Sequence, residues 1–249
     1  MWRWTRLWAA ALMWVGLSHA AQAVTCEAIR FDGNAYTICQ VAPAKENLRL
    51  FLDDADGTPY GHFTTLQNDL QRKGRSLKFA MNAGMYHDDR APVGHYVEEG
   101  KTRMRVIPNA GPGNFGLLPN GIFCLRDGRA DVFETRQFLA KKPSCTFATQ
   151  SGPMLVIDGE LHPRFLPDST SRYIRNGVGT SADGQTAIFA ISDNTVTFHE
   201  FARLFRDKLD LPNALFFDGN VSRLYAPDID RWDGGRRMGP VVGVTEDIN

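Results

Sequence analysis

Four short segments of the chain share one pattern, in which an apolar run ends at a polar side chain followed by glycine or another small residue. The polar side chains are Asn82, Gln150 with Ser151, Arg175 and Asp218. A buried strand that ends in this way delivers a polar group to the rim of a pocket. We therefore predict one polar site, built where several strands finish.

Asp218 is the residue in these segments best suited to catalysis. It follows the apolar run 214–217, precedes Gly219, and belongs to one of seven Asp-Gly pairs. Most such pairs are turns, because both residues tolerate the positive φ of tight hairpins. Here the preceding phenylalanines would shield one side of the carboxylate from water, and residues 220–223 do not alternate like a returning strand. A carboxylate held in this way can serve as acid, base or nucleophile in glycoside cleavage.

Arginine and asparagine side chains at the other strand ends suit an anionic sugar. Arg175 precedes Asn-Gly-Val-Gly, whose glycines would let a ligand approach the backbone. A guanidinium can hold a phosphate or carboxylate through two parallel hydrogen bonds, and Arg223 is a weaker candidate for the same role. Asn82 begins the segment Asn-Ala-Gly-Met-Tyr (82–86), whose apolar and aromatic residues are typical of a sugar-binding wall. The alternative for Arg175 is a solvated or structural charge, and the alternative for Asn82 is an ordinary turn.

Other familiar catalytic patterns are missing from the sequence. Ser151 lies in Gln-Ser-Gly-Pro rather than Gly-x-Ser-x-Gly, which indicates a hydrogen-bonding group at a turn and not a nucleophile. The histidines form no His-x-x-x-His pair, and the chain contains neither a phosphate-binding loop nor a dinucleotide fingerprint. We therefore predict neither a metal nor a cofactor.

Short apolar runs separated by glycine turns predict a single α+β domain with mixed, hairpin-rich β-sheets and a few packed helices. Strand–turn–strand units are expected at 121–133 and 154–161. Helical spacing of apolar residues predicts one helix from residue 63 to Gly74 and another over 197–210, which a Thr197/Glu200 capping box opens. With strands at 186–192 and 214–217, the second helix completes a strand–helix–strand unit. Asp218 then lies at a carboxyl strand end, the edge where open α/β sheets bind ligands.

The first 23 residues have the features of a cleaved secretory leader. Arg3 and Arg6 precede an apolar stretch of about ten residues, and Ala-Gln-Ala at 21–23 is a small-x-small cleavage site. The alternative is an uncleaved membrane anchor. A leader is favoured because the stretch is short for a bilayer, which needs about 20 apolar residues. Residues 24–249 are predicted to form one exported domain, periplasmic or secreted, without stable membrane insertion.

Charge and cysteine usage agree with an exported protein. The chain has 28 Lys and Arg against 28 Asp and Glu, so we predict no nucleic-acid partner. All four cysteines follow the leader, and an even number in an oxidising compartment predicts two disulfides. Of three possible pairings, Cys26–Cys39 and Cys124–Cys145 are preferred because each closes a local loop that contains turn signals.

Taken in order, seven segments resemble the phosphodiester glycosidase family, and specifically its compact exported bacterial branch. They are Met-Asn-Ala-Gly-Met-Tyr (81–86), Pro-Val-Gly (92–94), Gly-Asn-Phe (113–115), Pro-Asn-Gly-Ile-Phe (119–123), Gln-Ser-Gly-Pro-Met-Leu-Val-Ile-Asp-Gly (150–159), Arg-Asn-Gly-Val-Gly (175–179) and Phe-Asp-Gly (217–219). The chain departs from the family pattern after Asp218, where Asn220 stands in place of a small residue.

The resemblance implies a hydrolase that cleaves the glycosidic bond of a sugar-1-phosphate diester in envelope or extracellular glycans. The implied catalytic residues are Asp218, Asn82 and Arg175. The implied substrate-binding residues are Tyr86, His95, Gln150, Ser151, Gly152, Gly219, Ser222 and Arg223. In this hypothesis the arginines hold the phosphodiester, the sugar packs near Tyr86 and His95, and Asp218 acts at the anomeric carbon as nucleophile or as base for water. The alternative is an envelope protein that binds a glycan or anionic polymer without cleaving it.

Overall fold

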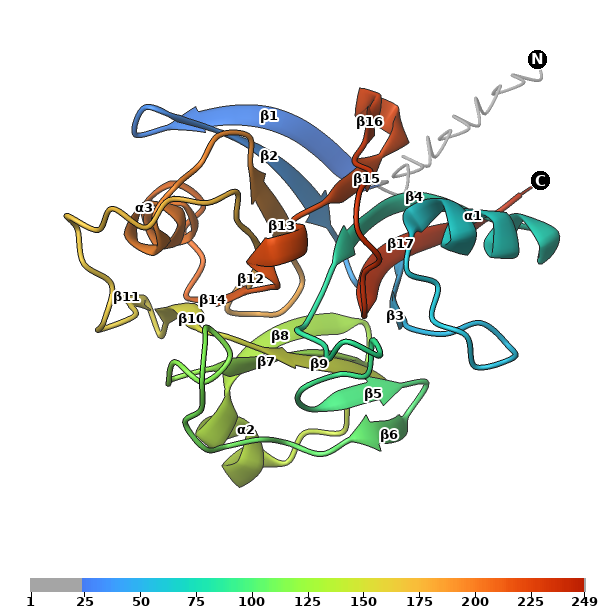
Figure 1. Ribbon diagram of the computed structural model, residues 1–249, viewed down its shortest axis with the longest axis horizontal. Helices are drawn as coiled ribbons and strands as arrows, with labels where there is room; N and C mark the ends of the chain where they lie inside the picture. The colour runs from blue at the N-terminus through green and yellow to red at the C-terminus, as the bar shows by residue number, and fades with distance from the viewer. Residues whose placement is uncertain (1–23, 249) are drawn as a thin grey trace, which may run out of the picture.

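The computed structural model describes residues 24–248, and its three β-sheets pack around a shared core (Figure 1). The predicted leader at 1–23 lies outside the described residues. The predicted α+β class is confirmed, and the strands paired in these sheets run antiparallel to their neighbours. Between residues 24 and 248, no helix has the length and apolar content needed to cross a bilayer.

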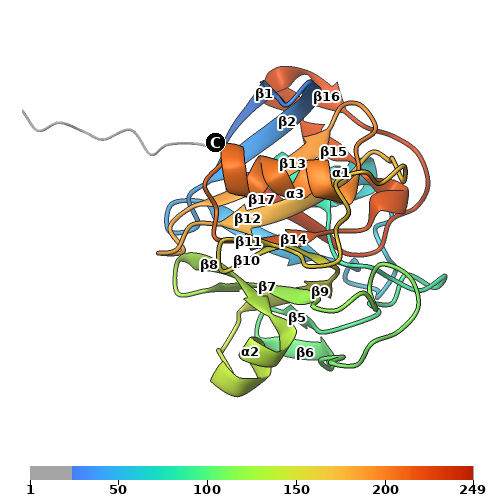
Figure 2. The same cartoon turned by 90° about the vertical axis from the view of Figure 1, so that its left-hand side faces the viewer.

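The largest sheet contains seven strands in the order β1-β2-β13-β12-β14-β10-β11. The strands are β1 (Thr25–Phe31), β2 (Asn34–Val41), β10 (Met154–Ile157), β11 (Glu160–Leu161), β12 (Asn176–Thr180), β13 (Ala187–Ser192) and β14 (Asn213–Phe216). Helix α3 (Phe198–Arg203) continues as a π-helical segment over Leu204–Lys208 and packs on one face of this sheet (Figure 2). The predicted capping box of Thr197 and Glu200 is confirmed at its start.

A second sheet has the order β16-β15-β4-β17-β3. Its strands are β3 (Asn47–Phe51), β4 (Arg75–Asn82), β15 (Leu224–Ala226), β16 (Arg231–Trp232) and β17 (Val241–Asp247). Helix α1 (Phe63–Arg72) packs on it through Phe63, Leu66 and Leu70, the three residues whose spacing predicts the helix. The chain turns away just after this helix at Gly74, where φ is +71°. Two 3₁₀ turns, Gly219–Val221 and Pro227–Ile229, flank β15.

The third sheet has the order β6-β5-β9-β7-β8. Its strands are β5 (Tyr96–Glu98), β6 (Lys101–Met104), β7 (Gly121–Arg126), β8 (Arg129–Glu134) and β9 (Phe147–Ser151). Helix α2 (Thr135–Lys141), which is not among the helices predicted from the sequence, packs on this sheet through Phe138. The Glu134 carboxylate caps the helix by accepting the backbone N–H groups of Arg136 and Gln137.

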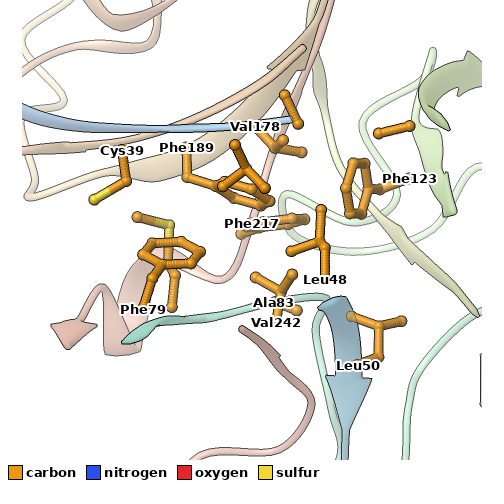
Figure 3. Close-up of a cluster of buried hydrophobic side chains, with 14 of the residues drawn as sticks. Cys39, Leu48, Leu50, Phe79, Ala83, Phe123, Val178, Phe189, Phe217 and Val242 are labelled. Atoms are coloured by element: carbon orange, nitrogen blue, oxygen red, sulfur yellow. The ribbon is translucent and has the colours of Figure 1, made fainter. Parts of the chain in front are cut away.

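The three sheets meet in a core of aromatic and aliphatic side chains (Figure 3). Phe189 of the first sheet lies 4.9 Å from Phe79 of the second and 5.8 Å from Phe123 of the third, measured between ring centroids. Phe217, directly after β14, completes the group at 6.4 Å from Phe123. Because each sheet contributes to one buried cluster, the strand ends that surround it are held at fixed positions.

Both preferred disulfides are confirmed, as are both predicted hairpins. Cys26 pairs with Cys39 across β1 and β2, and Cys124 pairs with Cys145. In the β7–β8 hairpin, Asp127 and Gly128 both have positive φ, and so do Asp158 and Gly159 between β10 and β11. The hairpin interpretation of these Asp-Gly pairs is therefore correct.

Candidate active site

A cavity of about 510 Å³ lies where the ends of strands from different sheets come together. It is lined by Met85, Tyr86, Val93, Pro112, Gly113, Asn114, Phe115, Ser171, Tyr173, Arg175, Phe198, Phe216, Asp218 and Gly219. Four of the predicted site residues are in this lining: Asp218, Arg175, Tyr86 and Gly219. The cavity therefore contains a carboxylate, a guanidinium, several aromatic rings and backbone amides.

The register of β12 against β14 brings Arg175 and Asp218 to the same cavity. The two strands are antiparallel and Gly177 pairs with Phe216, so the residues before β12 lie beside the residues after β14. The backbone N–H of Phe217 donates to the Asn176 carbonyl at 3.0 Å. Strand β12 lies between β13 and β14, which therefore run in the same direction, as the strand–helix–strand prediction requires.

Asp218 differs from the Asp-Gly pairs of the hairpins. Neither Asp218 nor Gly219 has a positive φ, and the chain continues into the 3₁₀ turn Gly219–Val221 instead of returning as a paired strand. The backbone N–H of Asp218 donates to the Ala83 carbonyl at 3.3 Å. This bond joins the end of β14 to the end of β4, so two sheets fix the position of the Asp218 backbone.

Asn82 is fully buried and joins three segments beside Asp218. Its Nδ2 donates to the Asp218 carbonyl at 2.9 Å, and its Oδ1 accepts from Asn176 Nδ2 at 3.0 Å and from the Arg223 backbone N–H at 2.9 Å. The Ser222 hydroxyl lies 3.1 Å from Asn176 Oδ1 and extends the network. Neither Asn82 nor Ser222 is in the cavity lining, so their geometry is that of groups that hold the Asp218 segment.

Arg175 is 2 % exposed and forms no ion pair with any described residue. Its Nε donates to the Val196 carbonyl at 2.9 Å and its Nη2 donates to the Ser171 carbonyl at 3.0 Å. Burial lowers the pKa of Arg175 to about 10, so the side chain is still a cation at neutral pH. A guanidinium has five N–H donors, which leaves donors available for an anion in the cavity.

Aromatic rings surround the Arg175 guanidinium. Its Cζ lies 3.6 Å from the centroid of Phe198, 5.5 Å from Tyr173 and 5.6 Å from Phe216. Phe198 stacks in turn on Phe165 at 5.0 Å, with only 6° between the ring planes. The site therefore places a desolvated cation against aromatic faces, an arrangement that stabilises the charge.

Phe198 and Tyr173 line the cavity but are not among the site residues predicted from the sequence. Phe198 reads only as part of the apolar face of α3. The Thr197 cap could have indicated its position, because it makes Phe198 the first helical residue, and helical side chains point back toward the N-terminus. Tyr173 had no comparable signal, since a bridge to Val196 places it and the two residues are distant in sequence.

The glycines after Arg175 serve packing within the sheet. A Cβ on Gly177 would lie 2.5 Å from the Leu215 carbonyl oxygen, and one on Gly179 would lie 2.8 Å from the Phe205 ring. These positions therefore admit a neighbouring strand and helix instead of the ligand that the sequence suggested.

Gln150, Ser151 and Gly152 lie behind the cavity wall and not in its lining. Gln150 Oε1 accepts the backbone N–H groups of His95 (3.0 Å) and Ile107 (2.9 Å), which ties two loops together. A Cβ on Gly152 would lie 3.0 Å from the Phe115 carbonyl oxygen, so glycine lets the loop that carries Phe115 approach. The Ser151 hydroxyl is buried without a hydrogen-bond partner.

The structure places His95 and Arg223 outside this cavity. His95 lines a separate cavity of about 310 Å³ near Phe138, and its Nδ1 lies 3.0 Å from the Met104 carbonyl oxygen. Burial lowers the pKa of His95. Arg223 is also buried, donates to the Arg236 carbonyl, and lines a hollow of about 120 Å³ beside Trp232.

The fold and cavity together define a class: a disulfide-bonded α+β protein with a carboxylate and a buried cation in one polar pocket. The chain belongs to the phosphodiester glycosidase family, whose model matches residues 75–245. It is 34% identical to "Uncharacterized protein YigE" of Escherichia coli (strain K12) over 191 residues, which cover 77% of this chain and 73% of that protein.

Solved structures share the fold at low sequence identity. The catalytic domain of zebrafish N-acetylglucosamine-1-phosphodiester alpha-N-acetylglucosaminidase, auto-inhibited by its pro-peptide, superposes with a TM-score of 0.60 at 14% identity. The match covers 89% of this chain and 81% of that one. A putative exported protein from Burkholderia pseudomallei gives a TM-score of 0.55 at 12% identity, with coverage of 85% and 74%.

Proposed function

We propose that this chain is an exported hydrolase that cleaves the glycosidic bond of a sugar-1-phosphate diester. The observation that carries the proposal is the presence of Asp218 and the buried Arg175 guanidinium in one cavity. Membership of the phosphodiester glycosidase family supports the same reaction class.

Arg175 binds the phosphodiester in this mechanism. Its cation is already desolvated, and two backbone carbonyls with the Phe198 ring hold it in place, so it is pre-organised for an anion. The aromatic lining, including Tyr86 and Tyr173, contacts the faces of the sugar. Asn82 acts indirectly, by holding the Asp218 backbone through its 2.9 Å hydrogen bond.

Asp218 acts at the anomeric carbon. It either attacks C1 and forms a glycosyl ester that water then hydrolyses, or it takes a proton from water that attacks C1 directly. In both routes the bond between C1 and the phosphate oxygen breaks, and the phosphate monoester leaves with the bonding electrons. A phosphate oxygen leaves more readily than an alkoxide, so a strong general acid is less necessary.

The test is hydrolysis of sugar-1-phosphate methyl diesters, followed by NMR detection of methyl phosphate and free sugar. The panel starts with α-N-acetylglucosamine, the sugar named for the zebrafish neighbour, and includes glucose, galactose and mannose. Asp218→Asn should lower kcat at least about 100-fold, while its thermal unfolding matches that of the unmutated protein. The anomer of the first product distinguishes the two routes, since a glycosyl ester intermediate retains configuration.

One result would contradict the role of Asp218, and another would contradict hydrolysis itself. Near-normal turnover by a folded Asp218→Asn variant would remove Asp218 from the reaction. Retention of the diesters by the unmutated protein without product release, across the panel, would instead favour the alternative of a glycan-binding envelope protein.

Export is the second part of the proposal. It is supported by the leader-like sequence at 1–23, the two disulfides and the fold shared with a putative exported protein. Mass spectrometry of protein from the extracytoplasmic fraction should find an N-terminus at Val24. An intact N-terminus at Met1 in that fraction would contradict cleavage.

A further inference from the structure

Arginine side chains without carboxylate partners gather beside Tyr86, on one rim of the cavity. Arg90 and Arg236 form no ion pair with any described residue. Arg237 forms none either, but its side chain lies against Gly61 and donates to the Pro59 carbonyl at 3.1 Å, so it is not part of this group. Many of the chain's other arginines are paired with carboxylates: Arg49, Arg72, Arg75, Arg103, Arg126, Arg129, Arg172, Arg203, Arg206 and Arg231. Arg30, Arg105, Arg136 and Arg164 also form no ion pair with a described residue, so the feature that distinguishes Arg90 and Arg236 is their position beside Tyr86 and the cavity.

Contacts with Tyr86 place the Arg90 side chain and the backbone at 236–237 next to the cavity. The Arg90 guanidinium carbon lies 5.2 Å from the Tyr86 ring centroid, and Arg90 Nε is buried without a hydrogen-bond partner. The Tyr86 hydroxyl donates to the Arg237 carbonyl at 3.1 Å, which puts the exposed Arg236–Arg237 pair beside the same ring. Gly239 fits against Tyr86 so closely that a Cβ there would lie 2.4 Å from the ring.

Nearby carboxylates leave this positive charge unpaired. Asp88 and Asp89 are exposed on the loop that carries Arg90, and neither forms an ion pair with a described residue. Asp89 instead accepts the Ala91 backbone N–H at 3.0 Å. Burial and the Asp218 charge raise the pKa of Tyr86, whereas Arg90, Arg223 and Arg236 act in the opposite direction. Arg223 is buried and donates to the Arg236 carbonyl, so Arg90 and Arg236 are the two of these cations that we consider for an anion at the rim of the cavity.

We propose that Arg90 and Arg236 form a second anion subsite, and that the substrate carries a further phosphate on the sugar whose bond is cleaved. The inference rests on the proposed function, because Arg175 is assigned to the phosphodiester at C1. Arg175 lines the cavity with Asp218, and Arg90 packs on Tyr86, which lines the same cavity. A repeating glycosyl-phosphate oligomer, in which every sugar lies between two phosphodiesters, has this distribution of charge.

The experiment compares two probes built on the sugar that the diester panel identifies. The first carries one methyl phosphodiester at C1, and the second carries another methyl phosphodiester on a ring hydroxyl, with each hydroxyl position prepared in turn. At low ionic strength the best doubly charged probe should have a kcat/KM about ten-fold higher than the singly charged probe, mainly through KM. This preference should shrink in 0.5 M salt, where exposed charges are screened.

Variants assign the preference to residues. Arg236→Gln alters an exposed side chain, and the Arg90→Gln/Arg236→Gln double variant should bring the ratio between the two probes close to one. Arg30→Gln is the matched control, because Arg30 is an exposed arginine of β1 outside the cavity lining. A preference that survives the double variant overturns the assignment to these residues.

The outcomes separate this inference from the function on which it rests. Turnover of the singly charged probe with no gain from the second phosphate at any position overturns the second subsite and leaves the hydrolase standing. Failure of every sugar in the diester panel overturns the hydrolase, and the subsite proposal falls with it.

Discussion

Two regions next to Asp218, one before β12 and one before β15, each contain a buried arginine. The two arginines differ in the cavity that their side chains reach. Arg175 lines the cavity together with Asp218, and aromatic rings surround its guanidinium. Arg223 is five residues beyond Asp218 in sequence, yet its side chain reaches the Arg236 carbonyl and a separate hollow. Burial lowers the pKa of both side chains, so neither burial nor residue type separates them.

The backbone decides which arginine can meet a ligand. Arg223 comes directly before β15, and Asn82 fixes its N–H, so its side chain is directed by the second sheet. Arg175 comes directly before β12, which pairs with β14 in the first sheet. The ability of an arginine to meet an anion in this cavity therefore depends on which strand it precedes, and not on its distance from Asp218 along the chain.

The largest expected effect is the difference in kcat/KM between two single variants, Arg175→Gln and Arg223→Gln. Arg175→Gln should lower kcat/KM for a sugar-1-phosphate diester about 100-fold, because the anion loses a buried charged partner. Arg223→Gln should leave kcat/KM within a few-fold and act mainly on stability, since Arg223 contacts backbone and not the cavity. Steady-state kinetics and urea unfolding of both variants check this. Equal losses of kcat/KM would abolish the distinction between the two regions.

The next effect concerns Asn82, which joins the two regions. Asn82→Ala removes partners from Asn176, Arg223 and the Asp218 carbonyl, so we expect a loss of about 2–3 kcal/mol in the free energy of unfolding. Because the Asp218 segment is released, kcat should fall as well. Asn213→Ala, at the other end of β14, is the matched control: it removes a 3.0 Å bond from the Asp158 N–H and should leave kcat unchanged.

Urea unfolding and kcat are measured on the same preparations. An Asn82→Ala variant with normal kcat would show that Asp218 holds its position without the asparagine network.

Local elements of the fold could be predicted because short-range chemistry specifies them. Thr197 and Glu200 fix the start of α3, and Asp-Gly pairs fix two hairpins. The preference for short loops gave both disulfides. Helix α2 could not be predicted from its cap, because the capping residue is Glu134, which is outside the usual set of capping residues. The packing of three sheets around one core depends on contacts between distant segments, which no local pattern encodes.

The candidate site divides in the same way. Strand ends predicted that Asp218 and Arg175 would meet, because both precede or follow buried strands that could be located in the sequence. The sequence could not separate side chains that line the cavity from those that support its walls. Gln150 illustrates the difficulty, since its amide bonds two segments, at His95 and Ile107, that lie 55 and 43 residues from it in sequence. Phe198 was hidden for the opposite reason, because an apolar helix residue looks the same whether it packs in the core or under a guanidinium.

A smaller effect, on the free energy of unfolding, is expected from protonation of His162, which belongs to the ring stack behind Arg175. His162 stacks on Phe165 at 4.7 Å between centroids, and Phe165 stacks on Phe198. Burial, with a smaller contribution from the nearby Arg164 charge, lowers the pKa of His162 to about 4. Below its usual pKa near 6.5 the unfolded chain binds the proton more readily than the native state, so stability is lost as the pH falls from 6.5 to 4.

This linkage predicts a loss of about 1–1.5 kcal/mol by pH 5.5 from His162 alone. His162→Phe keeps an aromatic ring in the stack and removes the titrating group, so it should flatten the fall in unfolding free energy between pH 6.5 and pH 5.5. The exposed His87→Asn variant is the control and should retain the slope. Urea unfolding at several pH values measures it, and an unchanged slope in His162→Phe would remove this residue from the acid response.

The smallest effect tests whether the aromatic surroundings of Arg175 matter to the ligand. Phe198→Leu keeps an apolar side chain at the start of α3 but removes the ring 3.6 Å from the guanidinium. A cation–π contact of this kind contributes about 1 kcal/mol, so we expect about a five-fold rise in KM for the diester with a smaller change in kcat. Phe198→Tyr retains the ring and should restore KM, whereas Phe201→Leu, on the same helix but outside the cavity lining, should change stability and not KM. If both Phe198→Leu and Phe201→Leu lower stability and leave KM unchanged, the Phe198 ring acts only through the packing of α3. The charge on Arg175 is then held by its two carbonyl partners alone.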